Sequence, residues 1–329
     1  MRIAQIANFY APTSGGLRIA VEEAGRGYVA AGHERVLIVP GPAGTQERTA
    51  AGWRVVVPGP RLPGLGHYRV LRRRRIRRLL DEWRPDVLEV SDKVSLQWLA
   101  RWARRRRVRV VLFSHERLDA ILRPWAPAWF PLRAAADAAN RRLARLADQV
   151  VVTSRFSAAE FLRAGAPNLL RVPLGVDLDT FRPAAPPEPA FAEPGYAEPA
   201  ARVPAAAVPG TESTVRLIMV SRLSREKQPE RAIEAIRILR ARGVPARLLV
   251  LGDGPMRNRL RRRSIGLPVT FLGHIAGRRD LAQLVAGCDA ALLPSPVESF
   301  GLATLEALAC GTPVVGPAAG AAGELLGEP

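Results

Sequence analysis

The chain has 329 residues, enough for two domains of ordinary size, and 48% of them are hydrophobic. No stretch approaches the roughly 20 apolar residues of a membrane-spanning helix, and the N-terminal MRIAQIANFY reads as a strand rather than as a signal peptide. We therefore expect a cytoplasmic protein. The two cysteines, Cys288 and Cys310, lack metal-binding spacing and sit beside apolar runs, so we expect reduced core residues and no metal site.

The formal net charge of +19 indicates an anionic partner: a phosphorylated substrate, an anionic membrane surface or a nucleic acid. Six arginines gather from Arg72 to Arg78 around Ile76, in a basic amphipathic pattern typical of helices that lie on anionic membranes. A solvated helix face in an arginine-rich chain is the alternative. No aromatic residues interleave with the basic runs and no nucleic-acid-binding motif is present, so we expect no nucleic acid partner.

The first elements form a β-α-β unit. Residues 2–7 and 35–39 read as strands, and residues 17–31 as the helix between them. Gly15 and Gly16 precede that helix, where the missing side chains would let a phosphate or a sugar approach the backbone. The G-x-G-x-x-G dinucleotide fingerprint is absent, and a plain turn would use the same glycines.

Further strands at 85–90, 108–113 and 149–153 alternate with helical patterns, as in a parallel α/β sheet. His115 follows the second of these strands, at the carboxyl end where such sheets bind ligands. It is therefore a candidate for the substrate site, although a lone histidine is more often structural.

Residues 183–214 are rich in Pro, Ala and Glu and carry almost no large apolar residues. Such a segment cannot bury enough surface to fold alone. We interpret it as a linker between an N-terminal α/β domain, residues 1–182, and a C-terminal α/β domain, residues 215–329.

The second domain opens with an apolar strand at 215–220, and a helix follows from Pro229. Arg222 and Lys227 lie between the two, where cations ahead of a helix can clamp an anion such as a diphosphate. Lys227 is one of only two lysines among 49 basic residues, and an arginine fork does not reproduce its compact charge. For Arg225, which lies between them, an exposed charge at a helix start is the alternative.

Residues 292–316 read as a strand, a loop, a helix and a second strand. The free N–H groups and the dipole of the helix N-terminus favour an anion such as a pyrophosphate. Four residues form this N-terminus: Ser299, Phe300, Gly301 and Leu302. Glu298 precedes the helix and Glu306 lies eight positions further on, too far for the two carboxylates to share a metal or to act as a close acid–base pair. They can accept hydroxyl hydrogen bonds at two points of a long ligand, unless they are ordinary surface glutamates.

The segment PSPVESFGLATLEALACGTPVV, with Glu298 and Glu306 in an E-x7-E pattern, resembles the retaining nucleotide-sugar glycosyltransferases of family 4. These enzymes are also called glycosyl transferases group 1, and the resemblance is to actinobacterial members. It implies the GT-B fold, in which two Rossmann-like α/β domains with parallel sheets face each other across a cleft. Family members continue well past the E-x7-E motif, so we expect the second domain to be incomplete.

The resemblance also implies roles for the candidate residues of the second domain. Glu298 would contact the transferred sugar, and Glu306 would contact the nucleotide ribose. Arg222 and Lys227 match the R-x4-K pair that holds the donor diphosphate, together with the helix N-terminus.

The remaining candidates are implied by the same resemblance. Gly15 and Gly16 would face the donor phosphates, and His115 would lie beside the transferred sugar or the acceptor. Gly273 and His274 follow a strand, and they would lie against the nucleotide base.

The reaction implied is transfer of a sugar from a nucleotide-sugar to a lipid or glycan hydroxyl, with retention of configuration. We expect mannose from GDP-mannose, at the inner face of the plasma membrane, with UDP-glucose and UDP-GlcNAc as the nearest alternatives. No cofactor is expected, because the cations named above can neutralise a diphosphate. Three rival functions stay open: a GT-B epimerase that needs only donor and water, a phosphorylase that needs inorganic phosphate, and a non-catalytic remnant that binds a nucleotide or a membrane.

Overall fold

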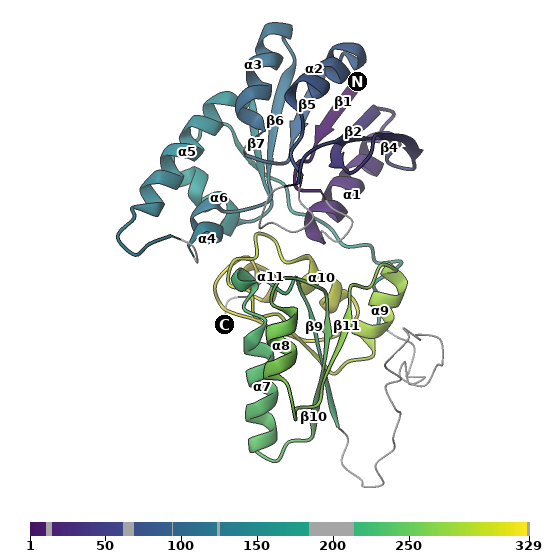
Figure 1. The fold of residues 1–329 in the computed structure, drawn as a ribbon, viewed down its shortest axis with the longest axis vertical. Coiled ribbons are helices and arrows are strands. Elements are labelled where there is room, and N and C mark those ends of the chain that lie inside the picture. Colours follow the sequence, from purple (N-terminus) through teal and green to yellow (C-terminus); the bar gives the residue numbers. More distant parts are fainter. Residues whose placement is uncertain (11–14, 62–68, 94, 124–125, 184–213, 328–329) are drawn as a thin grey trace. The chain divides into compact units, whose positions relative to one another are not determined.

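The computed structural model describes residues 1–10, 15–61, 69–93, 95–123, 126–183 and 214–327 (Figure 1). The chain divides into two compact units, Met1–Leu174 and Gly175–Pro329. The division therefore falls before residues 175–182, which the sequence analysis had assigned to the N-terminal domain. The predicted linker, 183–214, lies almost entirely outside the described residues.

In the described part of the first unit, eight strands form one sheet in the order β3-β4-β2-β1-β5-β6-β7-β8. Only β3 runs antiparallel to its neighbour among the strand pairs described. The strands are β1 (Arg2–Ile6), β2 (Glu34–Gly41), β3 (Thr45–Thr49), β4 (Gly52–Pro58), β5 (Val87–Val90), β6 (Arg109–Ser114), β7 (Gln149–Val152) and β8 (Leu169–Arg171). The predicted parallel strands are confirmed, whereas the β3–β4 hairpin was not predicted.

Helices cover this sheet: α1 (Gly16–Ala30), α2 (Arg73–Trp83), α3 (Leu96–Arg106), α4 (Leu118–Leu122), α5 (Leu132–Leu146) and α6 (Arg155–Arg163). Strand β2 shows how alternate residues serve the two faces. Leu37 and Val39 belong to the apolar cluster that contains Val21 of α1, whereas Ile38 belongs to the cluster that contains Ile76 of α2.

In the described part of the second unit, five strands form a fully parallel sheet in the order β11-β10-β9-β12-β13. The strands are β9 (Val215–Val220), β10 (Ala246–Leu251), β11 (Val269–Gly273), β12 (Ala290–Leu292) and β13 (Val314–Val315). Strands β10 and β11 lie on one side of β9, and the later strands β12 and β13 lie on its other side. The carboxyl ends of β9 and β12 therefore flank a topological switch point, where sheets of this kind bind ligands.

Helices lie on both faces of the second sheet: α7 (Glu230–Ala241), α8 (Arg257–Arg263), α9 (Arg278–Ala286), α10 (Leu302–Ala309) and α11 (Ala322–Leu326), with the 3-10 turn η1 (Arg225–Lys227) (Figure 1). Leu217 and Met219 of β9 pack with Ile233 of α7, while Ile218 packs in a separate cluster. That second cluster also contains Phe181, which is fully buried, and this explains why the segment after Leu174 belongs to the second unit.

None of the helices in the described ranges is long and apolar enough to cross a membrane.

Candidate functional site

The two loops at the switch point carry a cation and a carboxylate that the sequence analysis had singled out separately. Lys227 ends η1 after β9, and Glu298 lies in the loop between β12 and α10. The structure brings them together, because Lys227 Nζ donates a hydrogen bond to Glu298 Oε1 over 2.7 Å. Both side chains keep access to solvent, with 22% and 30% exposed. A ligand can therefore reach either charge.

The loop that carries Lys227 is held by a close backbone contact with the turn after β10. The Leu223 N–H donates to Asp253 O over 3.0 Å, and the Met256 N–H donates to Leu223 O over 2.9 Å. A Cβ added at Gly252 would lie 2.0 Å from Ser221 O, and Gly252 has a φ of +117°, so only glycine fits this position. This packing fixes the direction in which the residues after β9 leave the sheet.

The loop that carries Glu298 is held from the other side by the turn before α11. The Ala321 N–H donates to Glu298 O over 3.0 Å. Gly320, with a φ of +88°, approaches so closely that an added Cβ would lie 3.0 Å from Pro296 O. The Glu298 backbone is thereby anchored while its side chain faces Lys227.

Helix α10 begins at Leu302, and Gly301 is its N-cap with a φ of +90°. Gly301 has no side chain that could cap the helix, so the dipole and N–H groups of this end favour an anion. Of the other predicted residues here, Phe300 is buried and Ser299 is half-buried. Glu298 lies in the loop before this helix, as the sequence predicted.

Glu306 lies inside α10 and is only 5% exposed. Burial raises the pKa of its carboxyl to about 7, and the nearby Arg278 guanidinium opposes that rise. Arg278 Nη1 lies 3.2 Å from Glu306 Oε1. Glu306 is therefore a buried carboxylate that ionises near neutral pH.

The remaining predicted residues of this unit surround the same edge of the sheet. Arg222 is exposed in the loop after β9. Gly273 ends β11 with a φ of +77°, and its carbonyl accepts a hydrogen bond from the Gly252 N–H over 2.6 Å. His274, which follows, is exposed. The candidates of the second unit thus follow the carboxyl ends of β9, β11 and β12, except Glu306, which lies inside α10.

Gly15, Gly16 and His115 belong to the first unit. Gly15 is the N-cap of α1 and Gly16 its first residue, and both are exposed. The His115 ring stacks on Phe113, with centroids 4.5 Å apart. Its Nε2 is buried without a hydrogen-bond partner among the described residues, and desolvation lowers the pKa of His115 to about 3. The imidazole is therefore neutral at physiological pH.

Arg278, the first residue of α9, was not predicted as a site residue. It is 28 positions from Glu306 along the chain, and no local pattern links the two. Among the described residues, no three His, Cys, Asp or Glu side chains are grouped so as to hold a metal ion. The expectation that no metal or other cofactor is needed stays a prediction. Cys288 and Cys310 are free thiols and buried, as expected.

Comparison with known proteins identifies the family. Residues 208–328 match the family described as glycosyl transferases group 1, and residues 14–180 match glycosyltransferase family 4. The chain is 44% identical, over 319 residues, to a GDP-mannose-dependent alpha-(1-6)-phosphatidylinositol dimannoside mannosyltransferase of Mycobacterium tuberculosis. That match covers 96% of this chain and 79% of the relative. The chain belongs to the family 4 glycosyltransferases. It is thus an enzyme that transfers a sugar, as the E-x7-E motif had predicted.

The chain is also similar to a relative that shares fewer identical residues. A D-inositol 3-phosphate glycosyltransferase of Pseudarthrobacter chlorophenolicus is 28% identical over 294 residues, which is 84% of this chain and 64% of that protein.

Solved structures confirm the predicted GT-B fold. The Anabaena protein HepE, solved in complex with UDP and glucose, superposes with a TM-score of 0.72 at 21% identity, covering 100% of this chain and 83% of that one. Sucrose-phosphate synthase from Thermosynechococcus elongatus gives a TM-score of 0.72 at 22% identity, covering 97% and 82%. The two sheets described above are the Rossmann-like domains of this fold.

Proposed function

We propose that this glycosyltransferase moves mannose from GDP-mannose to a hydroxyl of a mannosylated phosphatidylinositol lipid, with retention of configuration. The donor and the acceptor are those named for the Mycobacterium tuberculosis relative, which matches nearly the whole chain. The observation that carries the proposal is the Lys227–Glu298 pair at the switch point of the second sheet. The pair supports the proposal because Lys227 can bind a phosphate, Glu298 can accept hydrogen bonds from a sugar, and the two lie within one hydrogen bond of each other.

Charge stabilisation of the leaving group accounts for the chemistry. The bond between the anomeric carbon of the mannose and the phosphate oxygen breaks, and its electron pair passes to the GDP. Lys227, Arg222 and the N-terminus of α10 stabilise the negative charge that develops on the diphosphate. The acceptor hydroxyl attacks from the same face, and its proton passes to the leaving phosphate oxygen.

The Lys227–Glu298 pair must rearrange when the donor binds. A diphosphate takes over as the counter-ion of Lys227, because its charge exceeds that of one carboxylate. Glu298 is then free to accept hydrogen bonds from mannose hydroxyls. Glu306, inside α10, accepts a hydrogen bond from the ribose.

The neutral state of His115 limits its role. A histidine whose pKa lies near 3 is not an imidazolium at neutral pH, so it does not supply a positive charge to the reaction. Its buried Nε2 lacks a partner among the described residues and can form one hydrogen bond with the sugar or the acceptor. Gly15 and Gly16 would let the donor phosphates approach the backbone.

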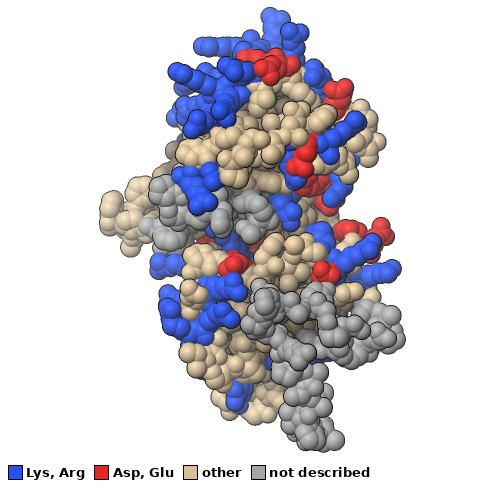
Figure 2. Space-filling model, turned by 45° about the vertical axis from the view of Figure 1, so that its right-hand side comes forward, with Lys and Arg blue, Asp and Glu red and all other residues tan. Residues whose placement is uncertain are grey.

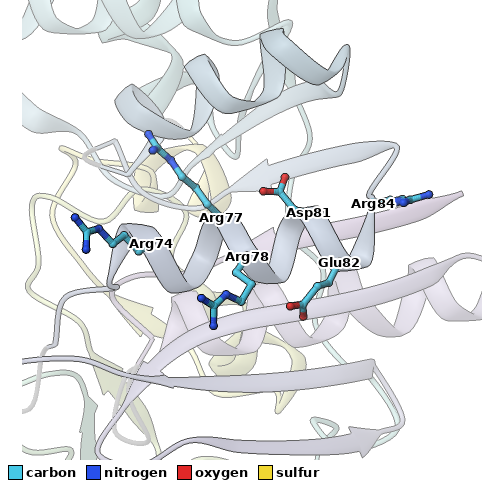
Figure 3. A pocket seen from close by; sticks show the side chains of 6 residues that line it. All are labelled: Arg74, Arg77, Arg78, Asp81, Glu82 and Arg84. Atoms are coloured by element: carbon cyan, nitrogen blue, oxygen red, sulfur yellow. The ribbon is translucent and has the colours of Figure 1, made fainter.

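The arginines of α2 supply the proposed contact with an anionic membrane. Ile76 and Leu80 are fully buried, so the opposite side of the helix faces solvent. That side forms an open depression of about 640 Å³ lined by Arg74, Arg77, Arg78, Asp81, Glu82 and Arg84 (Figure 3). Figure 2 shows basic side chains gathered at the upper end of the first unit. Such a surface would hold the enzyme at the inner face of the plasma membrane, beside a lipid acceptor.

A binding screen tests the donor site. We expect GDP-mannose to raise the thermal midpoint more than UDP-sugars do, and Lys227→Ala or Glu306→Ala to abolish that shift. An unchanged shift in both variants would show that the donor binds elsewhere. Binding without transfer to any acceptor would favour a non-catalytic role, and conversion of the donor in water alone would favour an epimerase.

Vesicle sedimentation tests the membrane surface. The protein is expected to sediment with vesicles that contain phosphatidylinositol and to be released by salt, because the attraction is electrostatic and screened. Arg74, Arg77 and Arg78 changed together to Gln should weaken this binding. Equal binding to purely zwitterionic vesicles would contradict the proposal.

A further inference from the structure

Arg278 occupies a position that helix stability does not explain. It is the first residue of α9, where the helix dipole disfavours a positive charge. Asp280 supplies the acidic group that such a helix start favours, and its carboxylate folds back to within 2.2 Å of where a Cβ of Gly277 would lie. The contacts of Arg278 outside its own helix must therefore account for its place.

Two contacts fix the guanidinium of Arg278. Its Nη1 lies 3.2 Å from Glu306 Oε1, and its Cζ lies 4.7 Å from the centroid of the Phe181 ring. Phe181 is fully buried in the core of the second unit, so the ring is an immobile platform. Stacking on the ring and pairing with the carboxylate together hold the Arg278 fork in one orientation.

The pair retains unused hydrogen-bonding capacity. Glu306 Oε1 and the Arg278 atoms Nε and Nη1 are buried, yet none forms an aligned hydrogen bond within the described part of the chain. Buried polar atoms are nearly always paired. A ligand hydroxyl that reaches both groups can donate to Glu306 Oε1 and accept from a guanidinium N–H, which suits the adjacent hydroxyls of a ribose.

We propose that Arg278 is the positioning residue of the ribose site, where it holds the Glu306 carboxylate ionised and directed at a ribose hydroxyl. The inference rests on the proposed function, since it concerns the nucleotide of the same donor. Burial alone would keep the pKa of Glu306 high, and Arg278 is the group that lowers it. Without Arg278, Glu306 would be protonated over more of the neutral range and would accept hydrogen bonds more weakly.

The dissociation constant of GDP, measured by calorimetry from pH 6 to pH 9, tests this role. For wild type we expect affinity to fall as the pH drops below about 7, where Glu306 gains its proton. Arg278→Gln should weaken GDP binding by about tenfold near pH 7, a loss typical of one charge-assisted hydrogen bond. In Arg278→Gln the affinity for GDP should also begin to fall at a higher pH than in wild type. Arg278→Lys keeps the charge and should restore most of the wild-type pH profile.

Three controls separate this role from a purely structural one. Arg279→Gln removes the neighbouring exposed arginine and should leave both affinity and profile unchanged. Glu306→Gln removes the titrating group, so the affinity of this variant for GDP should not vary across the pH range in which Glu306 titrates. Adding Arg278→Gln to that variant should cost little more, since the two residues act together.

The outcomes are distinct. If Arg278→Gln binds GDP more weakly but with the wild-type pH profile, Arg278 does not set the ionisation state of Glu306. The same holds if Arg278→Lys does not restore the wild-type pH profile. If Arg278→Gln does not fold, the Arg278→Lys and Glu306→Gln profiles decide. If wild type binds GDP with the expected profile but transfers no mannose, the proposed function fails while the inference about Arg278 stands.

Discussion

Replacing Glu306 with Gln should stabilise the second unit at alkaline pH while weakening donor binding. Burial raises the pKa of Glu306 from its ordinary value of 4.5 to about 7. Between these values the folded protein retains a proton that the unfolded chain has lost. The free energy of unfolding therefore falls as the pH rises through this window.

The size of the effect follows from the pKa difference. A rise of about 2.5 units, at 1.36 kcal/mol per unit, corresponds to about 3 kcal/mol of stability lost by pH 8. Glutamine does not titrate, so Glu306→Gln should gain up to that amount relative to wild type between pH 4.5 and pH 8. The effect of Arg278 on the carboxyl is already contained in this pKa, and the Gln side chain itself does not titrate, so the difference from wild type varies with pH only through the wild-type carboxyl.

The assay must report on the second unit alone. All six tryptophans lie between Trp53 and Trp129, so their fluorescence follows only the first unit. Urea titrations followed by hydrogen exchange of peptides that cover α10 report on the second unit. Glu234→Gln, an exposed glutamate of the same unit, serves as the control. Parallel stability curves for wild type and Glu306→Gln across pH would show that the carboxyl is not perturbed by burial and would refute the reasoning.

Three further predictions concern the supporting structure. Glu298→Gln removes the internal counter-ion of Lys227 and should tighten GDP binding by about two- to fivefold while transfer is lost; weaker GDP binding would contradict this ion-pair exchange. Gly252→Ala places a methyl group 2.0 Å from the Ser221 carbonyl at a strained φ, and should cost more than about 2 kcal/mol and weaken nucleotide binding, as measured by hydrogen exchange and calorimetry. Ser154 accepts the N–H of Ser157 at the start of α6, so Ser154→Ala should lower the stability of the first unit by about 1 kcal/mol in tryptophan-monitored unfolding.

Continuous apolar runs made the parallel strands predictable. Strand β9 was predicted with its observed bounds, 215–220, because its residues 217–220 form the apolar run that is typical of a strand buried on both faces. The β3 strand, TQERT, is an exposed edge strand without such an apolar run, and its hairpin with β4 was therefore not predicted. The segment that contains Phe181 was assigned to the wrong side of the division because its place depends on packing with the second core, which a local pattern does not contain.

The contacts within the candidate site also depend on packing that a local sequence pattern does not contain. Its individual residues could be chosen from motifs, but their pairing could not. Lys227 and Glu298 are 71 positions apart and meet because β9 and β12 are neighbours in the sheet. Arg278 and Glu306 meet only because α9 and α10 share one face of that sheet.

One assay decides whether the Lys227–Glu298 and Arg278–Glu306 pairs form a glycosyltransferase site for GDP-mannose. It measures the transfer of labelled mannose from GDP-mannose to phosphatidylinositol dimannoside by purified wild type and by Lys227→Ala at equal concentration. We expect a labelled lipid product with wild type, and a rate at least about 100-fold lower with Lys227→Ala, as when one stabilising group for developing charge is removed. Equal rates for the two proteins, or no labelled lipid with wild type, would contradict the proposed site or the proposed substrates.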